Sequence, residues 1–117
     1  IEDEADLRNA LKDALENEGH TVDAHETAER ALIACQQSLP DIILLDIMTH
    51  SLHGAAFLQR LELIGVDLKQ CPVIVLTALD NQVTKDKMAR YPIAEYLVKS
   101  QTPLSTIIQK VAQHAPA

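Results

Sequence analysis

The residues best suited to chemistry in this chain are carboxylates that follow apolar stretches. Asp46 closes the run Asp41-Ile-Ile-Leu-Leu-Asp46, in which four branched apolar residues stand between two acidic ones. A run without polar alternation is typical of a strand covered on both faces, as in a parallel α/β sheet. Ligands collect at the carboxyl edge of such sheets. Asp46 is therefore our candidate for the chemical centre of the protein.

Further polar residues follow or end the other predicted strands, apart from the one at 21–24, and they are Glu2, Asp3, Thr77 and Lys99. If neighbouring strands bring the carboxylates into one cleft, the carboxylates repel each other, and their pKa values rise unless a cation neutralises them. Ligands that offer only oxygen atoms favour a hard ion such as Mg²⁺. A lysine and a hydroxyl beside that ion suit a phosphoryl group, whose charge lies on its peripheral oxygens.

Strand and helix patterns alternate along the rest of the chain. Helices are predicted at about 5–18, from a Thr27 cap through Cys35, at about 55–64, at about 81–90, and from Pro103 in the first turn through Val111. Strands are predicted at 21–24, 41–46, 73–77 and 95–98, with the end of one more at Ile1. Gly19 is the predicted C-terminal stop of the first helix. Repeated strand-to-helix connections predict an α/β fold, with a mostly parallel sheet and helices on both faces.

Length and charge narrow the classes of function. The 117 residues suffice for one domain with one core. The net charge of −7 argues against direct binding to nucleic acid, because phosphate backbones are also negative. No apolar run is long enough to span a bilayer, and no signal peptide is visible. Cys35 and Cys71 fit a cytoplasmic protein with two free thiols, and one disulfide is the alternative.

The order and spacing of these residues resemble the receiver domain of two-component response regulators, over nearly the whole chain. The matching positions are Glu2, Asp3, Asp46, Met48, Gly54, Thr77, Ala78, Tyr96 and Lys99. The resemblance implies one receiver domain over 1–117, with a flavodoxin-like parallel sheet of five strands in the order 2-1-3-4-5 and five helices. Its implied partner is a histidine kinase or a histidine phosphotransfer protein.

The resemblance also implies a role for each acidic residue. Asp46 would accept the phosphoryl group, and Lys99 would pair with its oxygens. Asp3, Asp46 and the backbone carbonyl of Met48 would bind Mg²⁺, with Glu2 acting through water. Such a domain would phosphorylate itself and later lose the group by hydrolysis, rather than turn over a separate substrate.

A switch is implied as well. Thr77 would hydrogen-bond the phosphoryl group, and Tyr96 would turn inward when Thr77 moves. The surface of the helix at 81–90, the strand at 95–98 and the last helix would then change its affinity for partners, a second copy of the domain among them. This is a shift between two populations of one fold.

Three residues depart from the family pattern. His50 and His53 stand where proline and an acidic residue are usual, and Ser100 replaces the proline that usually follows the lysine. Because a cis bond before a residue other than proline costs about 2.5–4 kcal/mol, we predict a trans Lys99–Ser100 bond or a strained exception. The spacing of His50 and His53 could also indicate zinc, although the nearby carboxylates suit Mg²⁺ better.

The start of the chain is also unusual for the family, whose first strand is central. Only the end of that strand precedes the acidic pair. We expect further residues before Ile1 in the natural protein, and a strand supplied by another copy is the alternative.

Three other functions compete with the phosphorelay. A binding-only receiver that no longer transfers phosphate would explain the departures. A flavin carrier would need a phosphate-binding loop rich in Gly, Ser and Thr after the first strand, where Glu2, Asp3 and Glu4 stand instead. A Mg²⁺-dependent phosphatase would use similar carboxylates.

Overall fold

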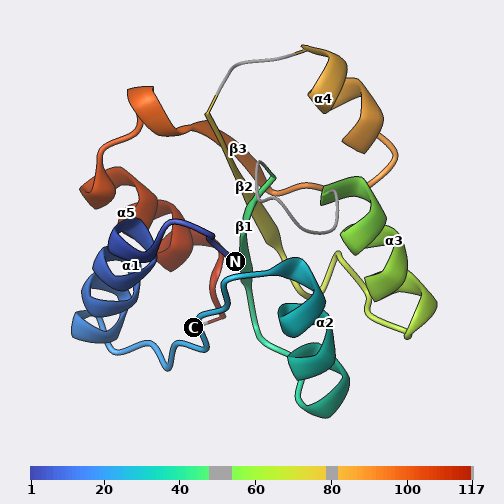
Figure 1. Cartoon of the computed structure of the whole chain (residues 1–117), viewed down its shortest axis with the longest axis horizontal. Helices are drawn as coiled ribbons and strands as arrows, with labels where there is room; N and C mark the ends of the chain where they lie inside the picture. Colours follow the sequence, from blue (N-terminus) through green and yellow to red (C-terminus); the bar gives the residue numbers. More distant parts are fainter. Residues whose placement is uncertain (48–53, 79–81, 117) are drawn as a thin grey trace.

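The computed structural model describes residues 1–47, 54–78 and 82–116, without the side chains at 83 and 84, and all structural statements below refer to this part. Its elements are α1 (Ala5–Asn17), α2 (Ala28–Gln37), β1 (Ile43–Asp46), α3 (Gly54–Leu63), β2 (Val73–Thr77), α4 (Gln82–Met88), β3 (Glu95–Val98), the short 3₁₀ helix η1 (Lys99–Gln101) and α5 (Leu104–His114). Figure 1 shows the strands between α1 and α5 on one side and α2 and α3 on the other. The predicted α/β architecture is confirmed.

The sheet is parallel and has the order β1-β2-β3. Asp46 lies opposite Leu76, and Thr77 lies opposite Val98. Because all three strands run the same way, their last residues share one edge. This edge carries the polar residues that the sequence pattern singled out.

Two of the five expected strands are represented only by short extended segments. The Ile1 nitrogen donates to the Leu44 carbonyl at 2.7 Å, and the Asp46 N–H donates to the Ile1 carbonyl at 3.0 Å. On its other side, the Glu2 N–H donates to the His25 carbonyl at 3.0 Å. The segment at 1–2 therefore lies between β1 and residue 25, as the order 2-1-3 requires. The prediction of a strand at 21–24 is wrong, because these residues form no strand in the structure. The neighbouring segment at 1–2 offers too few backbone groups for a ladder of hydrogen bonds.

Helix ends follow the predicted signals with one exception. Gly19 adopts a φ of 94° just after α1, and the Thr27 hydroxyl accepts the Arg30 N–H at 3.2 Å. Pro103, however, lies outside the first turn, as the N-cap of α5. The Pro103 carbonyl accepts the N–H groups of Thr106 and Ile107, and these hydrogen bonds form the first turn of α5. The missing N–H of proline is harmless at either position.

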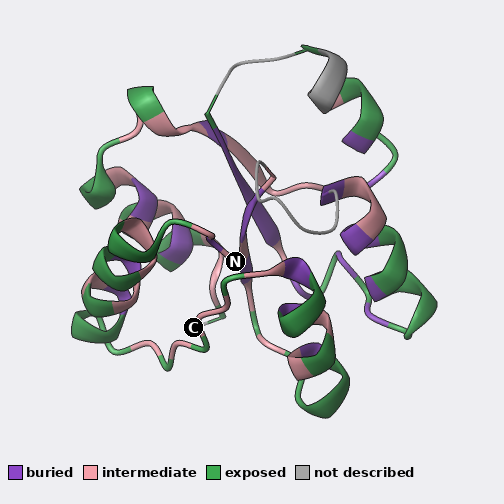
Figure 2. Ribbon diagram, viewed as in Figure 1, coloured by how far each residue is buried: buried purple, intermediate pink, exposed green. Residues whose placement is uncertain are grey.

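The core consists of two apolar clusters, one on each face of the sheet (Figure 2). Ile43 and Leu45 belong to the cluster with α2 and α3, whereas Leu44 packs against the cluster with α1 and α5. Successive side chains of a strand point to opposite faces, so both faces need apolar residues. The unbroken apolar run before Asp46 thus reflects two helix layers.

The two cysteines are free and buried, which confirms the expectation of thiols. Burial raises the pKa of Cys71 to about 11, so this thiol is protonated near neutral pH. Neither cysteine is therefore suited to act as a nucleophile. Among the described helices, none combines the length and the apolar character needed to cross a membrane.

The packing predicts a large difference between two residues of α3. Phe57 has 0% exposure and Leu63 has 77%. Phe57→Ala should lower the free energy of unfolding by about 3–5 kcal/mol, because it leaves a cavity in the core. Leu63→Ala should stay within about 0.5 kcal/mol of the unchanged protein. Urea unfolding followed by circular dichroism measures both values, and equal losses would contradict the assignment of the core.

Candidate functional site

Three carboxylates meet at the carboxyl edge of the sheet. One oxygen each of Glu2, Asp3 and Asp46 lies within 4.8 Å of the others. Glu2 is 2% exposed and Asp46 is 1% exposed, while Asp3 is half-buried. Asp46 is held there by β1, and the other two are held by the segment beside β1. The structure thus brings together the acidic residues predicted from the sequence.

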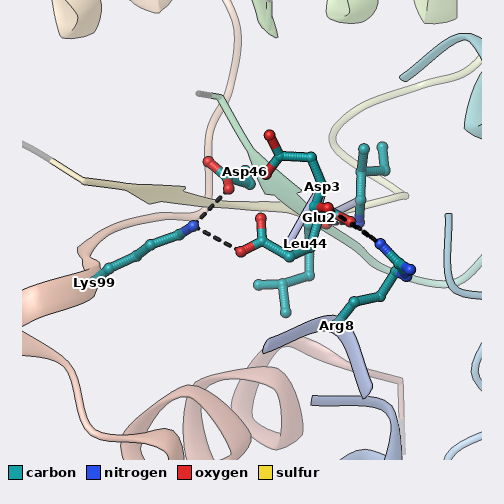
Figure 3. A network of polar contacts seen from close by, with 7 residues as sticks. Glu2, Asp3, Arg8, Leu44, Asp46 and Lys99 are labelled. Atoms are coloured by element: carbon teal, nitrogen blue, oxygen red, sulfur yellow. Dashed lines mark hydrogen bonds and ion pairs between the residues drawn. The ribbon is translucent and has the colours of Figure 1, made fainter. Parts of the chain in front are cut away.

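Lys99 joins the buried pair of carboxylates. Its Nζ lies 2.6 Å from Asp46 Oδ2 and 2.8 Å from Glu2 Oε1 (Figure 3). The residue stands directly after β3, where η1 begins. No cis peptide bond occurs in the described ranges, so the prediction of a trans Lys99–Ser100 bond is confirmed. Lys99 therefore reaches Asp46 although Ser100, and not the proline usual in the receiver family, follows it.

The electrostatics of the cluster follow from burial and from the contacts with Lys99. Burial raises the pKa of Glu2 to about 7, the adjacent Asp46 carboxylate adds to the increase, and the ammonium of Lys99 opposes it. Burial alone would lower the pKa of Lys99, but its hydrogen bonds to Asp46 and Glu2 outweigh burial and raise that pKa. The lysine is therefore charged at neutral pH. The three carboxylates together offer oxygen atoms to a further cation.

The donor set fits a hard divalent cation. Glu2 Oε2 is buried and has no hydrogen-bond partner within the described residues. A buried oxygen without a partner is costly, and a metal ion or a water bound to it would supply one. All three side chains offer oxygen, which suits Mg²⁺. Met48, His50 and His53 lie outside the described residues, so the predicted carbonyl ligand and the alternative zinc site stay predictions.

The predicted switch residues share one face of the sheet. Thr77 is the last residue of β2, next to Leu76, and it is buried. Tyr96 lies opposite Val75 in β3 and packs against the cluster of α2 and α3. Since alternate residues of a strand share a face, Thr77 and Tyr96 point to the same helix layer. Burial raises the pKa of Tyr96, so its phenol is neutral at physiological pH.

Arg8 contacts the acidic segment and was missed by the sequence reasoning. Its Nη1 donates to the Glu2 carbonyl at 2.9 Å and lies 3.5 Å from the Asp3 carbonyl. Arg8 lies one turn into α1, away from the strand ends where the other polar residues of the site gather. The sequence feature that could have indicated Arg8 is its place in the helix that directly follows Glu2 and Asp3.

Comparison with known proteins agrees with this geometry. The family model described as the response regulator receiver domain matches residues 1–112. The regulatory protein VanR of Enterococcus faecium is 30% identical over 113 residues, which cover 97% of this chain and 47% of VanR. The virulence transcriptional regulatory protein PhoP of Salmonella typhimurium is 34% identical over 99 residues, which cover 85% of this chain and 43% of PhoP. The chain thus spans less than half the length of these relatives.

Solved structures show the same fold. The receiver domain of NtrX from Brucella abortus has a TM-score of 0.78 at 25% identity, covering 96% of this chain and 91% of that one. The BeF3-activated N-terminal receiver domain of RstA from Klebsiella pneumoniae has a TM-score of 0.80 at 22% identity, covering 97% and 92%. Both likenesses extend over nearly the whole described chain.

The contacts of Lys99 predict a clear difference between two lysines. Lys99→Met leaves two buried carboxylates facing each other, so without Mg²⁺ it should lower the free energy of unfolding by about 3 kcal/mol. Lys110 pairs with Glu95 at 3.3 Å, and both side chains are more exposed than Glu2 and Asp46. Lys110→Met should therefore cost no more than about 1 kcal/mol. Similar losses in urea unfolding of the two variants would contradict the central position of Lys99.

Proposed function

The chain belongs to the response regulator receiver domain family of two-component systems, and we propose on this premise that Asp46 is its phospho-acceptor. The observation that carries the proposal is the position of Lys99 Nζ between the buried carboxylates of Asp46 and Glu2. A carboxylate held beside an ammonium and two further acidic residues can accept a phosphoryl group once a cation offsets the charge.

The transfer would start from a phosphohistidine on a histidine kinase or a phosphotransfer protein. An Asp46 oxygen attacks phosphorus and the new P–O bond forms as the P–N bond breaks. The leaving imidazole nitrogen keeps the electron pair of that bond and is protonated. Lys99 pairs with the phosphoryl oxygens. Later hydrolysis of the acyl phosphate returns Asp46 and releases inorganic phosphate.

We assign the metal site of the proposed reaction to the acidic cluster. Asp3 and Asp46 would hold Mg²⁺ directly, Glu2 would act through a water molecule, and the Met48 carbonyl would be the remaining protein ligand. The ion supplies positive charge that offsets the charge of the phosphoryl oxygens. The support is the close set of three carboxylates and the buried Glu2 Oε2 without a partner.

The proposed output is a change in the surface formed by α4, β3 and α5. After transfer, Thr77 hydrogen-bonds the phosphoryl group and Tyr96 turns inward on the same face of the sheet. Partners that bind the changed surface shift the equilibrium toward it. We include a second copy of the domain among these partners.

We propose that residues 1–117 form one receiver domain of a longer regulator in the cytoplasm. Two free thiols are typical of a reducing compartment. The binding-only alternative is not favoured, because Glu2, Asp3, Asp46 and Lys99 are all present and close together.

Phosphorylation of two variants, one in β1 and one just before it, tests whether Asp46 is the phospho-acceptor. With Mg²⁺ and acetyl phosphate, the unchanged protein should gain the mass of one phosphoryl group, and hydroxylamine should remove it. Asp46→Asn should gain none. Asp41→Asn, an exposed aspartate just before β1, should behave like the unchanged protein. Labelling of Asp46→Asn to the same extent would exclude Asp46 as the acceptor.

Mg²⁺ should stabilise the folded protein. At a Mg²⁺ concentration ten times Kd, the free energy of unfolding should rise by about 1.4 kcal/mol. Asp3→Asn should remove this increase, whereas Asp6→Asn, an exposed carboxylate on α1, should retain it. Thermal unfolding with and without the ion measures the effect. An unchanged increase in Asp3→Asn would place the ion elsewhere.

A further inference from the structure

We propose that Arg8 is a positioning residue, which holds the backbone of Glu2 and Asp3 so that their carboxylates face the cation site. This inference rests on the proposed Mg²⁺ site and adds a residue of α1 to it. The contacts of Arg8 given above are with main-chain carbonyls. Its effect therefore acts through the two acidic residues.

The choice of acceptors supports this role. Arg8 Nη1 donates to the main-chain carbonyl of Glu2 at 2.9 Å, and the Asp3 carbonyl lies 3.5 Å away (Figure 3). An arginine near three carboxylates would ordinarily pair with a carboxylate, because that geometry suits its planar fork. Donation to the carbonyl directs the guanidinium to the main chain of Glu2.

The other hydrogen bonds of the segment described above hold different backbone groups. The Glu2 N–H is bound by His25, and Ile1 is bound to β1. Within the described ranges, no backbone N–H donates to the Glu2 carbonyl. The N-cap of α1, Glu4, makes no side-chain cap hydrogen bond. Arg8 therefore links the carbonyl of Glu2 to α1.

A positive charge repels a nearby cation, so Arg8 supports the site through its hydrogen bond to Glu2 and not through its charge. The guanidinium of Arg8 is half-buried beside the acidic segment. Lys99 brings the other nearby positive charge to the opposite side of Glu2, through its carboxylate. Glu2 is therefore held at its main chain by α1 and at its side chain by the residue after β3.

Mg²⁺ affinity of three variants tests the proposal. Arg8→Met removes the donor and the charge, Arg8→Lys retains the charge without the fork, and Lys12→Met removes a charge one turn further along α1. Arg8→Met should raise the Kd for Mg²⁺ about tenfold, and Arg8→Lys about threefold, as for residues that orient metal ligands. Lys12→Met should stay within about twofold.

A second readout separates positioning from loss of the fold. The rate of phosphorylation by acetyl phosphate should fall in Arg8→Met at low Mg²⁺ and return to within about twofold of the unchanged protein at saturating Mg²⁺. If Arg8→Met does not fold, Arg8→Lys decides by the same two measurements.

The outcomes are distinct. A Kd in both Arg8 variants within about twofold of the unchanged protein, or an equal increase in Lys12→Met, would overturn the proposal. A rate that stays low in Arg8→Met at saturating Mg²⁺ would also overturn it. If the unchanged protein itself neither binds Mg²⁺ nor accepts a phosphoryl group, the proposed function fails first.

Discussion

The ammonium of Lys99 between two buried carboxylates is the interaction on which the site depends. Asp46 and Glu2 are almost fully buried, and two adjacent carboxylates in such a place are stable only beside a positive charge. Their attraction to Lys99 joins three parts of the chain, namely the first residues, the end of β1 and the start of η1. The oxygen atoms of the three carboxylates make a cation the natural next ligand.

The sheet supplies the geometry for this contact. Parallel β1, β2 and β3 end at one edge, with Asp46 opposite Leu76 and Thr77 opposite Val98. Helices on both faces exclude water from the strands, so the polar residues at the edge stand on a rigid apolar base. The family of response regulator receivers places its acidic cluster on such a sheet, and the match over residues 1–112 agrees with that.

Much of this arrangement could be predicted from the sequence, because the signals were local. Apolar runs without alternation revealed β1 and β2, and the residues that end them revealed the edge. The strand at 21–24 could not be judged in the same way, because strand formation depends on a neighbour with enough backbone groups to pair. Arg8 was missed for a different reason: its partners are main-chain carbonyls, and no side-chain pattern points to a carbonyl.

Chemical mapping of the phosphorylated residue tests the account most directly. The protein is incubated with Mg²⁺ and a phosphohistidine donor, the acyl phosphate is reduced with borohydride, and the peptides are sequenced by mass spectrometry. The account predicts homoserine at position 46 and aspartate at positions 3 and 41. Homoserine at another position, or phosphate retained on a serine or threonine, would contradict it.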